Sequence, residues 1–436
     1  MTGGTRGGDT PGGDTRGWDG ERLAEIAGRY GTPVHVLDIA RAERAADDLL
    51  AALGGLGRPG RAYYSVKTNY LPYLLERFAG RGLGADVVSG YELRAALRAG
   101  FAPRDIVFNG PVKTEDELAL AVRESVRVNI DGEHEIATLE RAAASAGVTA
   151  EVGLRLFPGV PVATSSDPAF VAAAERTAVR GRFGWPTGSR ELERVIGAIR
   201  AAPHLRLTAV HAHLGSQIVF PELLLAALDP VLAEAARLGV REVNIGGGFG
   251  VPGILRPRGT DRSPGPGLDP AAFLTSVDKR MAELGLADAV VACEPGRLLV
   301  SDAMCLLTRV MSRKELPDSR WLILDAGHHI APWTGTGEVH RFQPLGRDFS
   351  PDLVPWSLAG PLCYEADIHA PDSELPADLN VGDLLVMHDS GAYALGRSNN
   401  FIRMRAGVVA IEGERADVVW RAETDEDVFR FAVAPS

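Results

Sequence analysis

A lysine stands at the end of an apolar stretch near the start of the chain. Lys67 follows a run of aromatic, small and β-branched residues that begins at Ala62. Burying an ammonium group is costly, so such a lysine is either a surface residue at the edge of a sheet or a functional amine. The functional interpretation is a Schiff-base lysine whose pKa is depressed by its surroundings. Lys67 is therefore the first candidate for chemistry.

Other polar residues follow the remaining predicted strands of the first 300 residues. In a barrel of parallel strands, catalytic groups lie at the carboxyl ends of the strands, so such residues converge on one rim. A barrel with a purely structural role does not need a polar group at every strand end. The candidates are Asp86, Ser89, Asn109, Asp131, Arg155, His211, His213, Ser216, Gly246, Gly247, Gly248, Glu294 and Arg297.

A glycine-rich segment follows the seventh predicted strand. Residues 248–253 match the G-x-G-x-x-G pattern of dinucleotide-binding proteins. That pattern must open a helix, and Pro252 and Pro257 argue against one here. Two interpretations stay open: a plain tight turn, and a turn whose backbone amides wrap a phosphate group.

Two histidines and an acid–arginine pair complete the candidate set. His211 and His213 alternate along a predicted strand, so we expect only one to face the rim. A metal pair would need further ligands, but the other strand ends offer lysine, arginine and glycine, so we predict no metal. Glu294 and Arg297 flank a Pro-Gly turn as either a surface ion pair or groups for a ring nitrogen and an anion.

The elements that position these residues alternate between apolar runs and amphipathic helical patterns. This alternation is typical of βα units with a parallel sheet, and eight such units predict a closed (β/α)₈ barrel in an α/β chain. We also expect a long loop over residues 158–188 at the catalytic mouth. The predicted strands are Ala62–Lys67, Ala85–Ser89, Asp105–Asn109, Arg127–Asp131, Glu151–Phe157, Leu207–Leu214, Glu242–Gly246 and Val290–Glu294.

The pattern changes after Arg297, where strands follow one another without crossover helices. We expect the barrel over residues 41–298 and a second, all-β domain formed by residues 19–40 together with 299–436. Residues 1–18 are expected to be a disordered tail, since they can bury little apolar surface. The strands expected in the second domain are Val34–Asp38, Leu298–Arg309, Trp321–Asp325, Asp383–His388, Ile402–Glu412 and Ala416–Arg421.

The composition excludes several classes of protein. The chain has 436 residues, a net charge of −11 and only 3 cysteines. An acidic balance argues against nucleic-acid binding, and three scattered cysteines predict neither a disulfide framework nor a zinc site. We find no apolar run long enough to span a membrane and no signal peptide, so we expect a cytoplasmic protein.

Taken together, the motifs resemble those of diaminopimelate and ornithine decarboxylases, which are fold-type III pyridoxal-phosphate enzymes. The resemblance covers roughly residues 25–431. The motifs, in chain order, are Ser-Val-Lys-Thr-Asn, His-Leu-Gly-Ser-Gln, Gly-Gly-Gly-Phe-Gly, Glu-Pro-Gly-Arg, Gly-Pro-Leu-Cys-Tyr-Glu-Ala-Asp and Ser-Gly-Ala-Tyr.

The resemblance implies an amino-acid decarboxylase with pyridoxal 5′-phosphate bound to Lys67. Glu294 would keep the ring nitrogen protonated, His213 would stack on the ring, and Cys363 would donate a proton from the partner subunit of a homodimer. Groups implied around the phosphate, ring and lysine are Gly246, Gly247, Gly248, Ser216, Arg297, Asp86, Arg155 and Tyr393. Groups implied around the substrate are Arg297, Tyr364, Glu365 and Tyr393.

Two departures concern the substrate. Diaminopimelate decarboxylases usually carry an arginine soon after Asp-Ala-Gly, where this chain continues from Gly327 to Pro332 without one. They also carry an acid directly after the cysteine, where this chain has Tyr364. We therefore expect a small amino-acid substrate that can be a specialised one, for example from a natural-product pathway. The alternatives are an amino-acid racemase of the same fold and a non-catalytic cofactor-binding protein.

Overall fold

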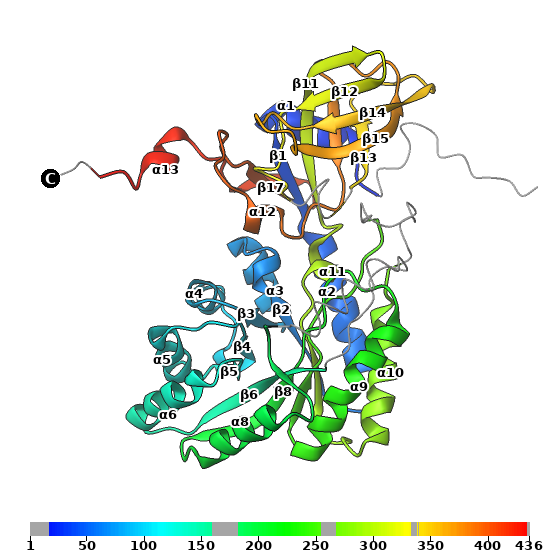
Figure 1. Ribbon diagram of the computed structural model, residues 1–436. Coiled ribbons are helices and arrows are strands. Elements are labelled where there is room, and N and C mark those ends of the chain that lie inside the picture. The colour runs from blue at the N-terminus through cyan, green and yellow to red at the C-terminus, as the bar shows by residue number, and fades with distance from the viewer. Residues whose placement is uncertain (1–16, 159–181, 254–266, 333–337, 339, 434–436) are drawn as a thin grey trace, which may run out of the picture. The chain divides into compact units, whose positions relative to one another are not determined.

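The computed structural model describes residues 17–158, 182–253, 267–332, 338 and 340–433 (Figure 1). The chain divides into two compact units. The barrel unit comprises Arg41–Pro252 and Gly259–Val300, and the β unit comprises Met1–Ala40, Gly253–Arg258 and Ser301–Ser436. Residues 1–16 of the predicted tail and 159–181 of the predicted long loop lie outside the described residues.

The barrel unit is built on eight parallel strands. They pair in the order β5-β4-β3-β2-β10-β9-β8-β6, and β5 also pairs with β6, which closes the barrel. The predicted (β/α)₈ barrel is thereby confirmed. A short strand, β7 (Trp185–Pro186), extends β6. The eight strands are β2 (Gly60–Ser65), β3 (Gly84–Val87), β4 (Ile106–Phe108), β5 (Arg127–Ile130), β6 (Ala150–Phe157), β8 (Leu205–His211), β9 (Glu242–Asn244) and β10 (Val290–Cys293).

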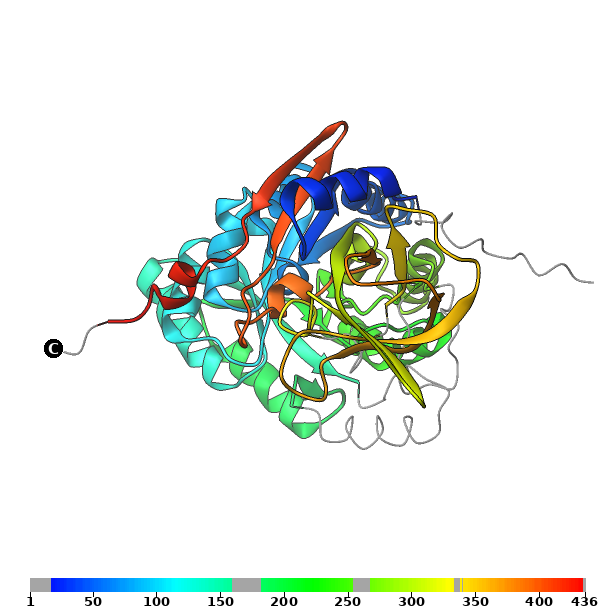
Figure 2. The same ribbon diagram turned by 90° about the horizontal axis from the view of Figure 1, so that it is seen from above.

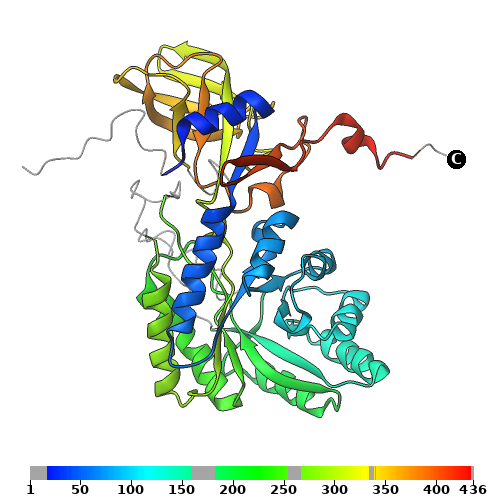
Figure 3. The same ribbon diagram turned by 180° about the vertical axis from the view of Figure 1, so that it is seen from behind.

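Helices lie on the outside of these strands, and α9 and α10 run side by side (Figures 1 and 3). Local sequence explains where several begin and end. Thr114 and Glu117 form a capping box at the start of α5, and Gly147 ends α6 in the left-handed conformation. The helices are α2 (Ile39–Gly54), α3 (Pro72–Gly80), α4 (Gly90–Arg98), α5 (Glu115–Arg123), α6 (His134–Ala146), α8 (Arg190–Ala201), α9 (Pro221–Leu238), α10 (Pro270–Glu283) and α11 (Arg297–Val300), with 3₁₀ turns η1 (Val66–Thr68) and η2 (Pro103–Asp105).

Seven of the eight predicted barrel strands end one to three residues earlier than expected at the carboxyl-terminal rim, and two of these differences place Lys67 and His213 beyond their strands. β2 ends at Ser65, so Lys67 lies in the 3₁₀ turn η1. β8 ends at His211, so His213 stands beyond the strand. The prediction that the two histidines alternate along one strand was therefore wrong, because the ladder stops before the second of them.

The β unit contains a nine-stranded mixed sheet that runs β15-β14-β12-β11-β1-β17-β18, with β16 pairing to β11 and β13 pairing to β16. The predicted second β-domain architecture is confirmed. β1 (Val34–Asp38) pairs antiparallel with β11 and parallel with β17, so an N-terminal strand joins C-terminal ones. The other strands are β11 (Met304–Leu316), β12 (Ser319–Leu324), β13 (Phe342–Leu345), β14 (Leu353–Ala359), β15 (Ile368–Pro376), β16 (Leu384–Met387), β17 (Gly407–Glu412) and β18 (Arg415–Trp420).

Two predicted strands of the β unit start later than expected, and three further strands were not predicted. The predicted strand Leu298–Arg309 begins inside α11, and its strand part starts only at Met304. The predicted strand Ile402–Glu412 starts only at Gly407. β13, β14 and β15 were not predicted.

The N-terminal helix α1 (Gly20–Tyr30) packs on the sheet of the β unit. Its Tyr30 hydroxyl donates to the carbonyl oxygen of Ala416 over 2.6 Å, beside the hairpin β17–β18 (Figure 2). Trp18, at the end of the predicted tail, is buried in the same apolar cluster as Leu23 and Ile26. Two short helices, α12 (Ala394–Arg397) and α13 (Asp425–Phe429), complete the unit. Among the described residues no helix is long and apolar enough to cross a membrane.

Candidate active site

Lys67 and a buried carboxylate meet at the carboxyl-terminal rim of the barrel. The Lys67 ammonium lies 2.5 Å from Oδ2 of Asp86 and 3.3 Å from Oγ of Ser65. Ser65 donates to the same Asp86 oxygen over 2.7 Å. The Asp86 side chain is fully buried, whereas that of Lys67 keeps 34% of its surface exposed. The Lys67 ammonium group is thus held by Asp86 and Ser65, and the exposed part of the side chain leaves it accessible to a small molecule.

Asn109 connects this pair to a second buried carboxylate. Its Nδ2 donates over 2.7 Å to Oδ1 of Asp86 and over 2.7 Å to Oε1 of Glu294. Asn244 donates to the same Glu294 oxygen over 2.8 Å, and Nε2 of His211 lies 3.1 Å from Oε2. Each Glu294 oxygen therefore has a hydrogen-bond donor inside the barrel.

These neighbours decide the charge of Glu294. Burial on its own raises the pKa of a carboxyl group, but His211, Lys67 and His213 lower the pKa of Glu294 well below its usual value. Glu294 is consequently a carboxylate, and it can hold a proton on a partner atom by charge pairing.

His213 lies at the glycine segment. Its Nδ1 accepts the backbone N–H of Gly247 over 3.3 Å. The protein atoms packed around the ring, followed by the charge of Lys67, lower the pKa of His213. The ring is accordingly a neutral imidazole, and His213 is exposed to solvent.

The predicted glycine turn brings backbone segments unusually close. A Cβ atom on Gly246 would lie 2.3 Å from the carbonyl oxygen of Ala212, and one on Gly247 would lie 2.1 Å from that of Glu294. Gly248 has a φ of +92°, which disfavours a side chain. In the described part of the chain, no acceptor meets the backbone N–H of Gly248 or of Phe249. A concave row of such amides is an anion site.

Arg155 is held by a neighbouring strand end. Its Nη1 lies 3.0 Å from Oδ2 of Asp131, whose other oxygen accepts the N–H of Gly184 over 2.5 Å. The guanidinium also lies over the Phe183 ring at 4.4 Å from its centroid. Ser216 is exposed after β8, and Arg297 is buried at the start of α11, both within the barrel unit.

A further ion pair of the barrel unit is completely buried. Lys113 and Glu135 have fully buried side chains, and their charged atoms are 2.8 Å apart. Lys113 also donates to the carbonyl oxygen of Gly110, and Glu135 accepts the N–H of Asp131 over 3.0 Å. This pair therefore ties together the loops that follow β4 and β5.

Sequence reasoning missed part of the network. His211 was expected only as an alternative to His213, and Asn244 and Asn129 were not named. Asn129 donates to Oδ1 of Asn109 over 2.8 Å, which orients the Asn109 amide. The available signal was the repeated asparagine near the ends of β4, β5 and β9, since an amide inside an apolar strand needs polar partners.

The comparisons with known proteins address the same region. The family described as pyridoxal-dependent decarboxylase, pyridoxal binding domain, matches residues 38–301. This chain belongs to that family. The match includes every rim residue described above, so the chain carries a pyridoxal-phosphate-binding domain and is a pyridoxal-phosphate-dependent amino-acid decarboxylase.

Relatives of this pyridoxal-dependent decarboxylase align along nearly the whole chain. The diaminopimelate decarboxylase of Pseudomonas aeruginosa is 33% identical over 425 residues, which are 94% of this chain and 95% of the relative. That of Bacillus subtilis is 29% identical over 418 residues, or 93% and 92% of the two chains. The structure of the M. jannaschii diaminopimelate decarboxylase with L-lysine matches with a TM-score of 0.83 at 25% identity, over 95% of this chain and 94% of that one.

The residues at the barrel rim fit pyridoxal phosphate. Lys67 provides an accessible amine, and Glu294 provides a carboxylate that can pair with a protonated ring nitrogen. The backbone N–H groups of Gly248 and Phe249 can donate hydrogen bonds to a phosphate group. The charges of a phosphate-bearing pyridine ring complement this set. Among the described residues, no group of three or more His, Cys, Asp or Glu side chains could hold a metal ion.

The remaining predicted site residues of this decarboxylase belong to the β unit. Cys363, Tyr364 and Glu365 lie exposed on the loop between β14 and β15. The Tyr364 hydroxyl lies 2.8 Å from Nδ1 of His328, and Asp367 fixes the loop by accepting the N–H groups of His328 and Leu362. Tyr393 has a φ of +63°, an uncommon conformation for a residue other than glycine, immediately before α12.

Proposed function

We propose that this enzyme decarboxylates a small amino acid, with Lys67 holding the cofactor. The observation that carries the proposal is the contact of the Lys67 amine with buried Asp86, linked through Asn109 to Glu294. The Lys67 amine is positioned by hydrogen-bond acceptors and is still accessible, so it is suited to imine formation with an aldehyde. Without this arrangement the barrel would offer only a phosphate site.

The remaining rim residues have complementary tasks in the proposal. Glu294 holds a proton on the pyridine nitrogen, and Asn109, Asn244 and His211 keep its carboxylate oriented. The neutral His213 ring stacks on the flat face of the cofactor. Gly246, Gly247, Gly248, Ser216 and Arg297 surround the phosphate, and Asp86 and Arg155 support the lysine and the ring.

The bound cofactor would supply an electron sink for the pair that carbon dioxide leaves on the substrate carbon. Asp86 positions the Lys67 amine and accepts a hydrogen bond from it. Arg297, with its fixed positive charge at the rim, is suited to an anionic substrate group. The carboxylate of Glu294 keeps the ring protonated throughout, because its ionised form is stabilised by its donors.

A proton must then return to the substrate carbon. We propose Cys363 of the partner subunit as its donor and Tyr393 as a contact to the cofactor and substrate. Cys363 is exposed, whereas Cys293 and Cys305 are buried. Exposed apolar side chains at Phe401 and Ile402 accompany it in the β unit, which supports a homodimer that covers them.

The substrate is proposed to differ from diaminopimelate. Tyr364 occupies the position after the cysteine, and its hydroxyl is paired with His328 rather than presenting a carboxylate. A phenol and an imidazole cannot neutralise the distal ammonium group of diaminopimelate as a carboxylate does. Tyr364 and Glu365 are the proposed substrate contacts, and a specialised amino acid is the proposed substrate class.

The test measures carbon dioxide release from meso-diaminopimelate, L- and D-lysine, ornithine and arginine by the purified enzyme. Lys67→Ala should lose both the visible cofactor band and its fixation by borohydride, whereas Lys279→Ala, an exposed lysine on α10, should retain both. Release from diaminopimelate alone would refute the specialised substrate. Exchange of the α-proton without carbon dioxide release would favour a racemase, and a fixed cofactor without turnover would favour a carrier.

Mixed dimers test the sharing of active sites. Lys67→Ala and Cys363→Ala homodimers should each be nearly inactive. Mixing the two variants should restore about a quarter of the wild-type rate, because half of the dimers then hold one intact site. No recovery after verified exchange of subunits would contradict the contribution of Cys363 across the dimer.

A further inference from the structure

The loop that carries Cys363 is joined to the segment after β12 by one buried carboxylate. Oδ1 of Asp367 accepts the backbone N–H of His328 over 2.7 Å, and Oδ2 accepts that of Leu362 over 2.9 Å. The carbonyl oxygen of Asp367 also accepts the N–H of Gly360 over 2.9 Å. The backbone before and after Cys363 is therefore held by a single residue.

The side chain of His328 extends this attachment to Tyr364, the residue that follows the cysteine. Nδ1 of His328 lies 2.8 Å from the Tyr364 hydroxyl. His328 is buried, and in the described part of the chain its Nε2 has no hydrogen-bond partner. Among those residues, the contact with Tyr364 is consequently the only hydrogen bond of the imidazole.

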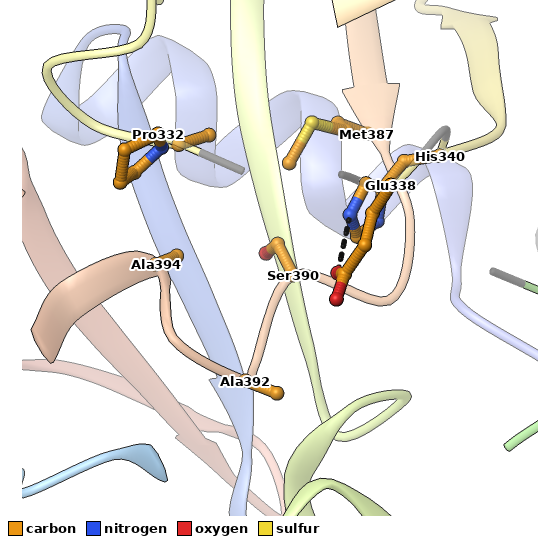
Figure 4. A pocket seen from close by; sticks show the side chains of 8 residues that line it. Pro332, Glu338, His340, Met387, Ser390, Ala392 and Ala394 are labelled. Atoms are coloured by element: carbon orange, nitrogen blue, oxygen red, sulfur yellow. Dashed lines mark ion pairs between the residues drawn. The ribbon is translucent and has the colours of Figure 1, made fainter. Parts of the chain in front are cut away.

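The His328 ring is itself fixed by its surroundings. It meets the His369 ring edge-on, with 5.7 Å between the centroids, and Nε2 of His369 donates to the carbonyl oxygen of Ala326 over 2.9 Å. His340 is engaged elsewhere in the β unit, because its Nε2 pairs with Oε2 of Glu338 at 3.5 Å (Figure 4). The Tyr364 hydroxyl is therefore held by one imidazole whose ring is packed in place.

Both ends of this hydrogen bond lie at departures from the pattern of diaminopimelate decarboxylases. His328 stands in the segment 327–332, which lacks the usual arginine, and Tyr364 stands in place of the usual acid. The two departures are thus in contact with each other. The Cys363 thiol is exposed and has no hydrogen-bond partner among the described residues, so its position depends on the loop and on the neighbouring Tyr364.

We propose that His328 is a positioning residue for Cys363 and acts through the Tyr364 hydroxyl. The inference rests on the proposed function, in which Cys363 returns a proton to the substrate carbon. Asp367 fixes the base of the loop, and the Tyr364–His328 hydrogen bond fixes the residue next to the thiol. A proton donor must lie within hydrogen-bond reach of the atom that it protonates, and a displacement of about 1 Å can cost about 100-fold in rate.

The experiment labels Cys363 of the full-length holoenzyme with bromotrifluoroacetone and records the fluorine NMR spectrum. Cys293 and Cys305 are buried, so the label is restricted to Cys363. The wild type should give one narrow resonance. His328→Leu and Tyr364→Phe should each shift or split it, because loss of a neutral hydrogen bond raises the share of other loop conformations about two- to tenfold. An unchanged resonance in both variants would overturn the proposal.

Further variants separate positioning from a general loss of stability. Tyr30→Phe removes another phenol hydrogen bond of the β unit, that to Ala416, and should leave the resonance unchanged. His328→Asn keeps a hydrogen-bonding group near the position of Nδ1, so its spectrum should lie closer to that of the wild type than the spectrum of His328→Leu does. The double variant His328→Leu/Tyr364→Phe should resemble either single variant, because both remove the same hydrogen bond. Additive changes in the double variant, or an equal change in Tyr30→Phe, would refute the assignment.

The catalytic consequence is a split between kcat and KM. For the amino acid from which carbon dioxide is released fastest in the panel above, His328→Leu should lower kcat about two- to tenfold and change KM by less than about twofold, because the thiol acts after the substrate is bound. Full activity of Cys363→Ala would refute the proposed function, whereas the NMR spectra would still decide whether His328 positions the loop. Tyr364 is exposed, so Tyr364→Phe preserves the test if His328→Leu does not fold.

Discussion

The buried Lys113–Glu135 pair allows a quantitative test of what holds the barrel rim in place. Both side chains have no exposed surface, and their charged atoms are 2.8 Å apart. Burial lowers the pKa of Lys113, and the charge of Glu135 opposes that shift. Glu135→Gln would leave the ammonium buried without a counter-charge. We expect a loss of about 3 to 5 kcal/mol in the free energy of unfolding of the barrel unit.

The control is a pair of the same chemistry at the surface. Glu115 is 79% exposed and lies 2.9 Å from Arg141, so Glu115→Gln should cost less than about 1 kcal/mol. The double variant Lys113→Met/Glu135→Gln should recover most of the loss, because no charge then stays buried.

Hydrogen exchange of peptides from β4 and β5, followed by mass spectrometry in increasing urea, reports on the barrel unit separately from the β unit. Equal losses for Glu135→Gln and Glu115→Gln would refute the reasoning, as would a double variant whose loss is the sum of the single losses.

Three further predictions follow from burial and close approach. Burial raises the pKa of Glu92 from 4.5 to about 7, so the stability that its neutral form provides is present below about pH 4.5 and is lost as the pH rises through 7. Relative to Glu92→Gln, the wild type should lose up to about 3 kcal/mol of unfolding free energy over that range in urea titrations; a constant difference would contradict this. Gly247→Ala should weaken cofactor retention in dialysis by at least about tenfold, because its Cβ would lie 2.1 Å from a backbone oxygen. The control Gly197→Ala, which meets open space in α8, should leave retention unchanged; equal retention in both would refute the close approach. Finally, the native protein should expose one fast-reacting thiol to Ellman's reagent, and Cys363→Ser should remove it; a second fast thiol would be inconsistent with the structure.

The barrel was predictable because each of its strands is buried and reads as a short apolar run between amphipathic helices. The β unit was harder to predict. β14 and β15 contain Pro355, Pro371 and Pro376, and β15 lies at the edge of the sheet, where exposed polar residues interrupt the alternation. The Leu298–Arg309 run is equally apolar in its helical and strand parts, so periodicity could not divide it.

The residues of the candidate site likewise include some that the sequence predicted and some that it could not predict. Lys67 and Glu294 were predictable because charged residues are rarely placed at the ends of buried apolar strands unless they are paired or functional. The role of His211 was not predictable, because it depends on β8 ending at that residue and on the Glu294 carboxylate from β10 lying 3.1 Å away. Asn244 and Asn129 contact partners from other strands, and such contacts become visible only when the barrel is closed.

The position of β1 has a consequence for synthesis on the ribosome. β1 lies between β11 and β17, which are made only after the whole barrel has been translated. At about 5 to 20 residues per second, β1 waits roughly 20 to 70 s for its second neighbour. During that interval an apolar strand with two open edges, and with one after β11 has emerged, is available to nascent-chain chaperones or to other chains, and the barrel can close first. Slowing translation between codons 301 and 407 should therefore expose the N-terminus to proteases without affecting the barrel.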